Sequence, residues 1–206
     1  MACMDDAQST AWGTLANNDE SPFLNGRLLI AMPGIGDPRF GHAVILMCAH
    51  SPEQAMGITL NRPMDRLPLS TLLDRLGVTV TSAPDDRPVL DGGPVERERG
   101  FVLHTDDFHA PHSTLEVAGG LALTATRDVL EAMGDAALRP RRAAMALGCA
   151  SWDSGQLERE IRENVWLACD PDEAIIFDDD FETKWVRALA KLGIRPEAIS
   201  LQSGRA

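Results

Sequence analysis

The segment from residue 28 to residue 63 constrains the fold of this chain more than any other. It holds two apolar runs, LLIAM and AVILMCA, and a third short run, MGITL. The turn between the first two, GIGDPRFG, is rich in the glycine, proline and aspartate that favour tight turns. The second run is nearly all apolar with β-branched residues, which is typical of a strand in the interior of a sheet. We therefore expect strands at residues 27–32, 42–49 and 56–60.

The rest of the chain mixes short strands and helices without a strict βαβ rhythm. Leucines at positions 69, 72, 73 and 76 follow helical spacing and predict a helix over residues 69–76. Further helices are expected at residues 126–133, 155–164 and 181–192. Further strands are expected at residues 78–80, 88–90, 101–104, 143–147, 165–169 and 174–177, with a hairpin over 115–126. This order favours an α+β fold over a doubly wound sheet.

No linker divides the chain, so we expect residues 23–206 to form a single domain. Residues 1–22 are small, acidic and without periodicity, and they are expected to form a flexible leader. The longest uninterrupted apolar run, residues 43–49, is too short to span a bilayer. The acidic N-terminus lacks the bases and the apolar segment of a signal peptide. Four scattered cysteines without a CxxC motif suit a reducing compartment, so the sequence predicts a cytoplasmic protein with no membrane partner.

The net charge of −12 argues against direct nucleic-acid binding, because it repels phosphate backbones at long range. The densest basic run is Arg139-Pro140-Arg141-Arg142. It is short and has no interleaved aromatic residues, so we interpret it as a solvated entrance to a strand.

Several familiar sequence motifs are incomplete or absent in this chain. Gly34 and Gly36 begin a dinucleotide-like pattern, but Arg39 replaces its third glycine and a strand follows where a helix is needed. No Walker A pattern occurs, and Ser151 does not lie in G-x-S-x-G. The segment HTDDFHAPH at residues 104–112 has metal-ligand residue types without a standard zinc spacing. We therefore predict no metal and no cofactor.

Polar residues at strand ends, and glycine-proline bends, are the remaining candidates for a functional surface. Such positions either converge on a ligand site or satisfy backbone groups where strands end. Cys149 precedes a helix whose N-terminus could lower the pKa of its thiol, and the alternative is an inert buried cysteine. The candidate ligand- or partner-binding residues are Asp37, Pro38, Phe40, His50, Asn61, Arg62, Gly92, Gly93, Pro94, Cys149, Trp152, Gly155 and Gln156.

Short motifs in a fixed order along residues 27–192 resemble those of the YqgE/AlgH family. They are Leu28-Leu29-Ile30-Ala31 with Pro33, Asp37-Pro38 with Phe40, His50, Gly57 with Leu60-Asn61-Arg62-Pro63, Gly92-Gly93-Pro94-Val95, Leu103-His104, Gly148, Trp152 with Gly155-Gln156-Leu157-Glu158, Trp166 and Trp185. Two positions depart from the family pattern. Ser151 and Asp153 flank the tryptophan where the family usually has glycine before it and often glycine or another small residue after it.

The resemblance implies a bacterial cytoplasmic protein with a branched or barrel-like β-sheet surrounded by helices. It implies no established reaction, although some members carry a label as transcriptional regulators of exopolysaccharide synthesis. We expect a non-enzymatic regulatory or adaptor protein that binds an unknown protein or small molecule through the candidate residues.

Two alternatives come from other functional classes. One is an enzyme with His50 as base and Cys149 as nucleophile, which requires the two side chains within hydrogen-bond reach, directly or through one water. The other is a small-ligand-binding protein. Direct DNA binding, which the regulator label suggests, requires a contiguous basic face and ranks last.

Overall fold

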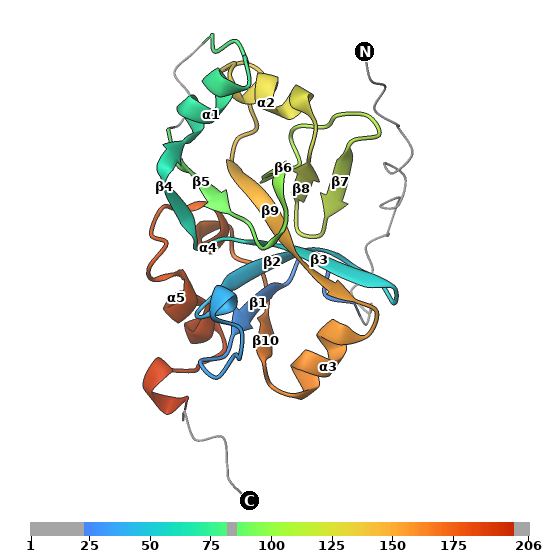
Figure 1. Cartoon of the computed structure of the whole chain (residues 1–206), viewed down its shortest axis with the longest axis vertical. Coiled ribbons are helices and arrows are strands. Elements are labelled where there is room, and N and C mark those ends of the chain that lie inside the picture. The colour runs from blue at the N-terminus through green and yellow to red at the C-terminus, as the bar shows by residue number, and fades with distance from the viewer. Residues whose placement is uncertain (1–22, 82–85, 200–206) are drawn as a thin grey trace, which may run out of the picture.

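The computed structural model describes residues 23–81 and 86–199 (Figure 1). The strands are β1 (Leu28–Ala31), β2 (Val44–His50), β3 (Gln54–Thr59), β4 (Pro63–Pro68), β5 (Pro88–Asp91), β6 (Val95–Thr105), β7 (Thr114–Val117), β8 (Leu121–Thr124), β9 (Ala143–Asp153) and β10 (Trp166–Cys169). The helices are α1 (Leu69–Arg75), α2 (Arg127–Met133), α3 (Gln156–Arg162), α4 (Glu173–Phe177) and α5 (Lys184–Lys191), with short 3-10 turns η1 (Pro38–Phe40) and η2 (Pro196–Ala198). The predicted leader, residues 1–22, lies outside the described residues.

The strands form one branched, curled sheet. Its main path runs β10-β1-β2-β3-β9-β6-β8-β7, and every neighbouring pair along it is antiparallel. The branch is β5, which pairs in parallel with β9 and antiparallel with β4. Helices α1 and α2 lie together at one end of the molecule, and α3 lies at the other (Figure 1). The predicted single α+β domain with a branched, barrel-like sheet is confirmed.

Strand β9 is shared by both halves of the sheet. Residues 150–153 pair with β3, whereas residues 143–149 pair with β6, and β5 runs beside them. Gly148 lies between the two halves at φ +73°, and an added Cβ there would come within 2.4 Å of the carbonyl oxygen of Gly93. The strand therefore crosses the β5–β6 connection at a backbone separation that only glycine allows.

Several predicted elements differ from the structure. Residues 78–80 form no strand, and residues 174–177 form α4 instead of a strand. The apolar sequence AIIF is compatible with either form, but the Asp172 carboxylate accepts hydrogen bonds from the N–H groups of Ala174 and Ile175 and starts a helix. Strand β4 was not predicted, and β6 and β9 are longer than expected.

Three buried clusters hold the fold together. The largest packs one face of the sheet against α4 and α5 and includes Phe101, Phe177 and Leu189. A second lies under α3 and includes Trp166, and a third joins α1 and α2 to the sheet through residues such as Met145. Each fully buried apolar side chain stabilises the fold by about 1.5–3 kcal/mol. None of the helices in the described ranges has the length and apolar character needed to cross a bilayer.

Candidate functional site

The turn that contains Asp37, Pro38 and Phe40 is held by local contacts. The Asp37 carboxylate accepts hydrogen bonds from the backbone N–H of Arg39 at 2.9 Å and from its guanidinium Nε at 3.0 Å. The side chain of Arg39 is the main reason that the pKa of Asp37 lies below its ordinary value. The Phe40 ring packs edge-on against the Trp166 indole, with 5.6 Å between ring centroids. Asp37 therefore caps a 3-10 turn, and Phe40 anchors that turn to the core.

Asn61 and Arg62 fasten the exit of β3 to the same turn. The Asn61 side chain accepts a hydrogen bond from the N–H of Val44 at 2.9 Å and donates one to the carbonyl of His42 at 2.9 Å. Arg62 donates through Nη2 to the carbonyl of Gly41 at 3.0 Å. The structure thus brings these two residues beside the Asp37–Phe40 turn, where their hydrogen bonds go to backbone atoms of residues 41, 42 and 44.

Gly92, Gly93 and Pro94 form the bend where β5 leads into β6. An added Cβ on Gly93 would lie 2.3 Å from the carbonyl carbon of Cys149. Glycine is therefore needed here, because the backbone of the bend passes directly against the backbone of β9. Cys149 is only 4% exposed, and burial raises the pKa of its thiol to about 11. The inert-cysteine alternative is therefore the one the structure favours.

Near Trp152, three side chains donate hydrogen bonds to the carboxylate of Glu160, a residue that was not among the predicted candidates. Glu160 accepts hydrogen bonds from the indole N–H groups of Trp152 at 2.9 Å and Trp166 at 2.8 Å. Its other oxygen accepts one from the side-chain amide of Gln156 at 2.7 Å. Gly155 immediately precedes α3 in a left-handed conformation. The i,i+4 spacing of Gln156 and Glu160 on α3 was the available signal, since it places both side chains on one helix face.

His50 has a structural role as well. Its Nδ1 accepts a hydrogen bond from the N–H of Leu24 at 3.0 Å, so its Nε2 donates to the Glu158 carboxylate at 3.0 Å. Both ring nitrogens are thus occupied, and the side chain is 2% exposed. His50 on β2 lies in register, through β3, with Trp152 on β9, so Cys149 lies two strands away from His50 and three residues from Trp152 along β9. The His50–Cys149 pairing required by the enzyme alternative is not formed.

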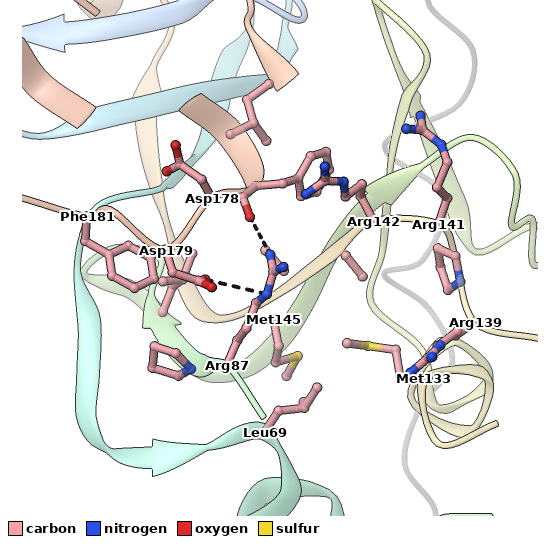
Figure 2. Close-up of a pocket in the computed structure, with 17 residues that line it drawn as sticks. Leu69, Arg87, Met133, Arg139, Arg141, Arg142, Met145, Asp178, Asp179 and Phe181 are labelled. Carbon is pink, nitrogen blue, oxygen red and sulfur yellow. Dashed lines mark hydrogen bonds and ion pairs between the residues drawn. The ribbon is translucent and has the colours of Figure 1, made fainter. Parts of the chain in front are cut away.

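A cavity of about 390 Å³ lies elsewhere, between α1, β5, the C-terminal end of α2, the start of β9 and the segment after α4. We call it the arginine pocket, because it is lined by Arg87, Arg139, Arg141 and Arg142. None of the candidate residues chosen from the sequence lines it. Figure 2 shows Arg87 on one side of the view, the other three arginines on the opposite side, and Met145 between them.

Arg87 is held in place from the α4 side of the pocket. Its Nη1 donates a short hydrogen bond to the carbonyl of Phe177, and its Nε lies 3.5 Å from a carboxylate oxygen of Asp179 (Figure 2). The side chain is one-quarter exposed, at 25%. This arginine therefore presents a fixed, partly desolvated charge to the cavity.

The opposite wall is the run Arg139–Arg142, which enters β9. Its backbone is fixed because Thr105 Oγ1 accepts from the N–H of Arg142 at 3.2 Å and the Asp107 carboxylate accepts from the N–H of Arg141 at 2.8 Å. The Arg141 guanidinium pairs with Glu173 at 2.7 Å. Arg139 forms no ion pair with any residue in the described ranges. The predicted solvated entrance to a strand is confirmed, since the three arginines are exposed and β9 follows them, and their side chains also line the cavity.

A buried lysine supports the acidic side of the pocket. The ammonium group of Lys184 donates to the carbonyls of Ile175 at 2.6 Å and Ile176 at 3.1 Å, and it lies 3.5 Å from the Asp178 carboxylate. Burial lowers the pKa of Lys184 to about 8, although Asp178 opposes the shift. Lys184 thereby fixes the C-terminal end of α4, which supplies the pocket with Ile176 and Phe177.

The chemistry of the pocket favours binding over catalysis. The described lining contains guanidinium groups, two carboxylates and apolar side chains, without a histidine, a cysteine or a hydroxyl group. Across residues 23–81 and 86–199, no three His, Cys, Asp or Glu side chains group as metal ligands. Guanidinium groups bind phosphate and carboxylate oxygens through paired hydrogen bonds. The arrangement is therefore suited to an anion.

Comparisons with known proteins agree on one family. The family model described as AlgH-like matches residues 28–197. A UPF0301 protein of Caulobacter vibrioides is 58% identical over 194 residues, which cover 94% of this chain and 99% of the relative. A UPF0301 protein of Beijerinckia indica is 45% identical over 213 residues, which cover 100% and 98%.

Two solved structures are similar to this fold. The solution structure of the AlgH protein from Pseudomonas aeruginosa has a TM-score of 0.72 at 36% identity and covers 93% of this chain and 100% of that protein. The crystal structure of protein DIP2367 from Corynebacterium diphtheriae has a TM-score of 0.63 at 16% identity and covers 86% and 90%. The second likeness concerns the fold alone. The resemblance noted in the sequence is confirmed.

Proposed function

This chain belongs to the AlgH-like family, and we propose that it is a non-enzymatic regulatory protein that binds a small anionic molecule in the arginine pocket. The observation that carries the proposal is the charge of the lining. The lining contains four arginines and two aspartates, so it has a net charge of +2 in a chain whose net charge is −12. A positive concavity on a strongly acidic protein attracts and concentrates small anions.

The dimensions of the pocket also support a small-molecule ligand. Its volume of about 390 Å³ falls within the range of about 300–1,000 Å³ typical of ligand pockets. The mixture of an apolar floor with a few convergent polar groups is the usual composition of such sites. In this proposal the motifs that carry the family resemblance maintain the scaffold, and the ligand binds at a separate place.

The non-enzymatic part of the proposal rests on the contacts and protonation of the two candidate catalytic side chains, His50 and Cys149. His50 has both nitrogens engaged, and the raised pKa of Cys149 keeps that thiol protonated at neutral pH. A regulatory protein of this kind would change its stability or its partner contacts when the anion binds.

Thermal unfolding of the full chain tests the proposal. Inorganic phosphate, added at constant ionic strength, is expected to raise the unfolding temperature of the wild type. The increase should be much smaller for Arg139→Glu, which reverses a charge of the pocket wall that has no ion-pair partner among residues 23–81 and 86–199. The matched control is Arg159→Glu, which makes the same charge change on the exposed face of α3. An equal increase in all three proteins would refute an anion site in this pocket.

A further inference from the structure

Resting on this proposed function, we propose that the ligand is an organic phosphate monoester. Its dianionic head would bind Arg139 and Arg142, and its short apolar body would lie on the pocket floor. The apolar floor consists of Leu69, Met133 and Met145 from three different elements. The two halves of such a molecule match two sides of one cavity that differ in chemistry.

The charge of the lining favours a phosphate monoester over a carboxylate. The lining has a net charge of +2, and a phosphate monoester has a charge of about −1.5 to −2 at pH 7. Arg139 has no ion pair with a described residue, and Arg142 lies 3.8 Å from Glu173, whose carboxylate is held at 2.7 Å by Arg141 instead. Two guanidinium forks can satisfy the three terminal oxygens of a phosphate group, whereas a carboxylate has only two.

Two aspartates in the lining limit how many phosphate groups the ligand can have. Asp178 and Asp179 also line the cavity, and in Figure 2 they lie on the side of Arg87, away from Arg139. A second phosphate group reaching across the cavity would approach the Asp178 carboxylate and would have to compete with Asp179 for Arg87. The pocket therefore suits a single phosphate group at one wall and disfavours a polyphosphate chain.

The floor explains why an inorganic phosphate ion would be an incomplete ligand. Leu69, Met133 and Met145 are 5%, 7% and 4% exposed and face the cavity. Because these side chains already expose little surface, the hydrocarbon surface removed from water on binding is mainly that of the ligand's own apolar body. Methionine side chains adapt to the shape of such a body because they are unbranched and polarizable. Burial of a few methylene groups corresponds to an affinity gain of at least about 10-fold, since each contributes ~0.8 kcal/mol.

Methyl-group NMR of the full chain tests this inference directly. The protein would be labelled with ¹³C at its methionine methyl groups, and the Met133 and Met145 signals assigned from Met133→Leu and Met145→Leu. It would then be titrated with inorganic phosphate, n-butyl phosphate, pentanoate and n-butanol. We expect butyl phosphate to bind at least about 10-fold more tightly than inorganic phosphate and to shift both signals. Arg139→Glu should abolish this response, and Arg159→Glu should retain it.

The other outcomes separate the two proposals. Equal affinity for inorganic and butyl phosphate, without a shift of the Met133 and Met145 signals, would overturn the monoester and leave the anion site standing. Binding of pentanoate as tight as that of butyl phosphate would also overturn the monoester alone. If no anion binds, both proposals fail. If n-butanol binds as tightly as butyl phosphate, the charged lining has no part in recognition, and both proposals fail again.

Discussion

Replacement of the buried Lys184 by methionine should change how protein stability depends on pH. Lys184 is fully buried, and burial lowers its pKa from 10.5 to about 8. Between these two values the folded state binds fewer protons than the unfolded state, because only the unfolded lysine is still charged. This residue therefore raises the free energy of unfolding of the wild type as the pH rises from about 8 toward 10.5. Below pH 8 the lysine is charged in both states.

The size of this effect follows from the pKa shift. A shift of one unit corresponds to 1.36 kcal/mol, so the lowered pKa adds about 2.5 kcal/mol to the wild-type free energy of unfolding between pH 7 and pH 10. Lys184→Met lacks the titrating group. Relative to the wild type, the variant should therefore lose about 2.5 kcal/mol over the same range.

Urea unfolding at pH 7, 8, 9 and 10 under reducing conditions measures the difference between the two proteins. The comparison has to be a difference, because the raised pKa values of buried thiols such as Cys48 make both proteins less stable as the pH rises. Lys191→Met, which removes a lysine paired with Asp172 at the surface, is the matched control. A difference that stays constant from pH 7 to pH 10, or a drift of the same size in the control, would refute the reasoning.

Two further substitutions and one chemical modification test the packing of the scaffold. Gly93→Ala should destabilise the protein by about 3 kcal/mol or more in urea unfolding, because its Cβ would overlap a backbone, whereas Gly34→Ala, with open space around it, should stay within about 0.5 kcal/mol. Asn61→Ala should lower the free energy of unfolding by about 1–3 kcal/mol, since a backbone N–H at the start of β2 loses its acceptor; a neutral result would contradict this. The Cys48 and Cys149 thiols, with pKa values raised to about 12 and 11, should react with iodoacetamide at pH 8 at least about 100-fold more slowly in the folded protein than in urea, as peptide mass spectrometry would show; comparable rates would refute their burial.

The local parts of the fold could be predicted from the sequence. The leucine spacing of α1 and the apolar run of β2 each depend on neighbours a few residues away, and both elements appear where expected. The hairpin of β7 and β8 follows from the glycine pair at 119 and 120. The prediction of a strand at residues 174–177 was wrong because these four apolar residues suit a strand and a helix equally well. The Asp172 cap favours the helix α4.

The pocket could not be predicted because tertiary packing alone assembles it. Arg87 contacts the backbone of Phe177, which is 90 residues away in the sequence. Arg139 belongs to a run that looks like an ordinary solvated surface until the cavity beside it is known. The candidate residues posed the opposite difficulty. A polar side chain at a strand end, such as Asn61, has the same sequence pattern whether it faces a ligand or backbone groups, and here it binds the backbone.

Strand β9 is the structural link between the two halves of the sheet. It supplies Met145 to the floor of the arginine pocket and Trp152 to the cluster under α3, and it pairs with a different strand at each place. Opening of either half therefore frees one end of β9, the strand whose other end the second half pairs with. We therefore expect a molecule that binds in the pocket to slow hydrogen exchange first at the amides of β6 and β9 beside Met145, and to slow it at α3 only to the extent that both ends of β9 open together.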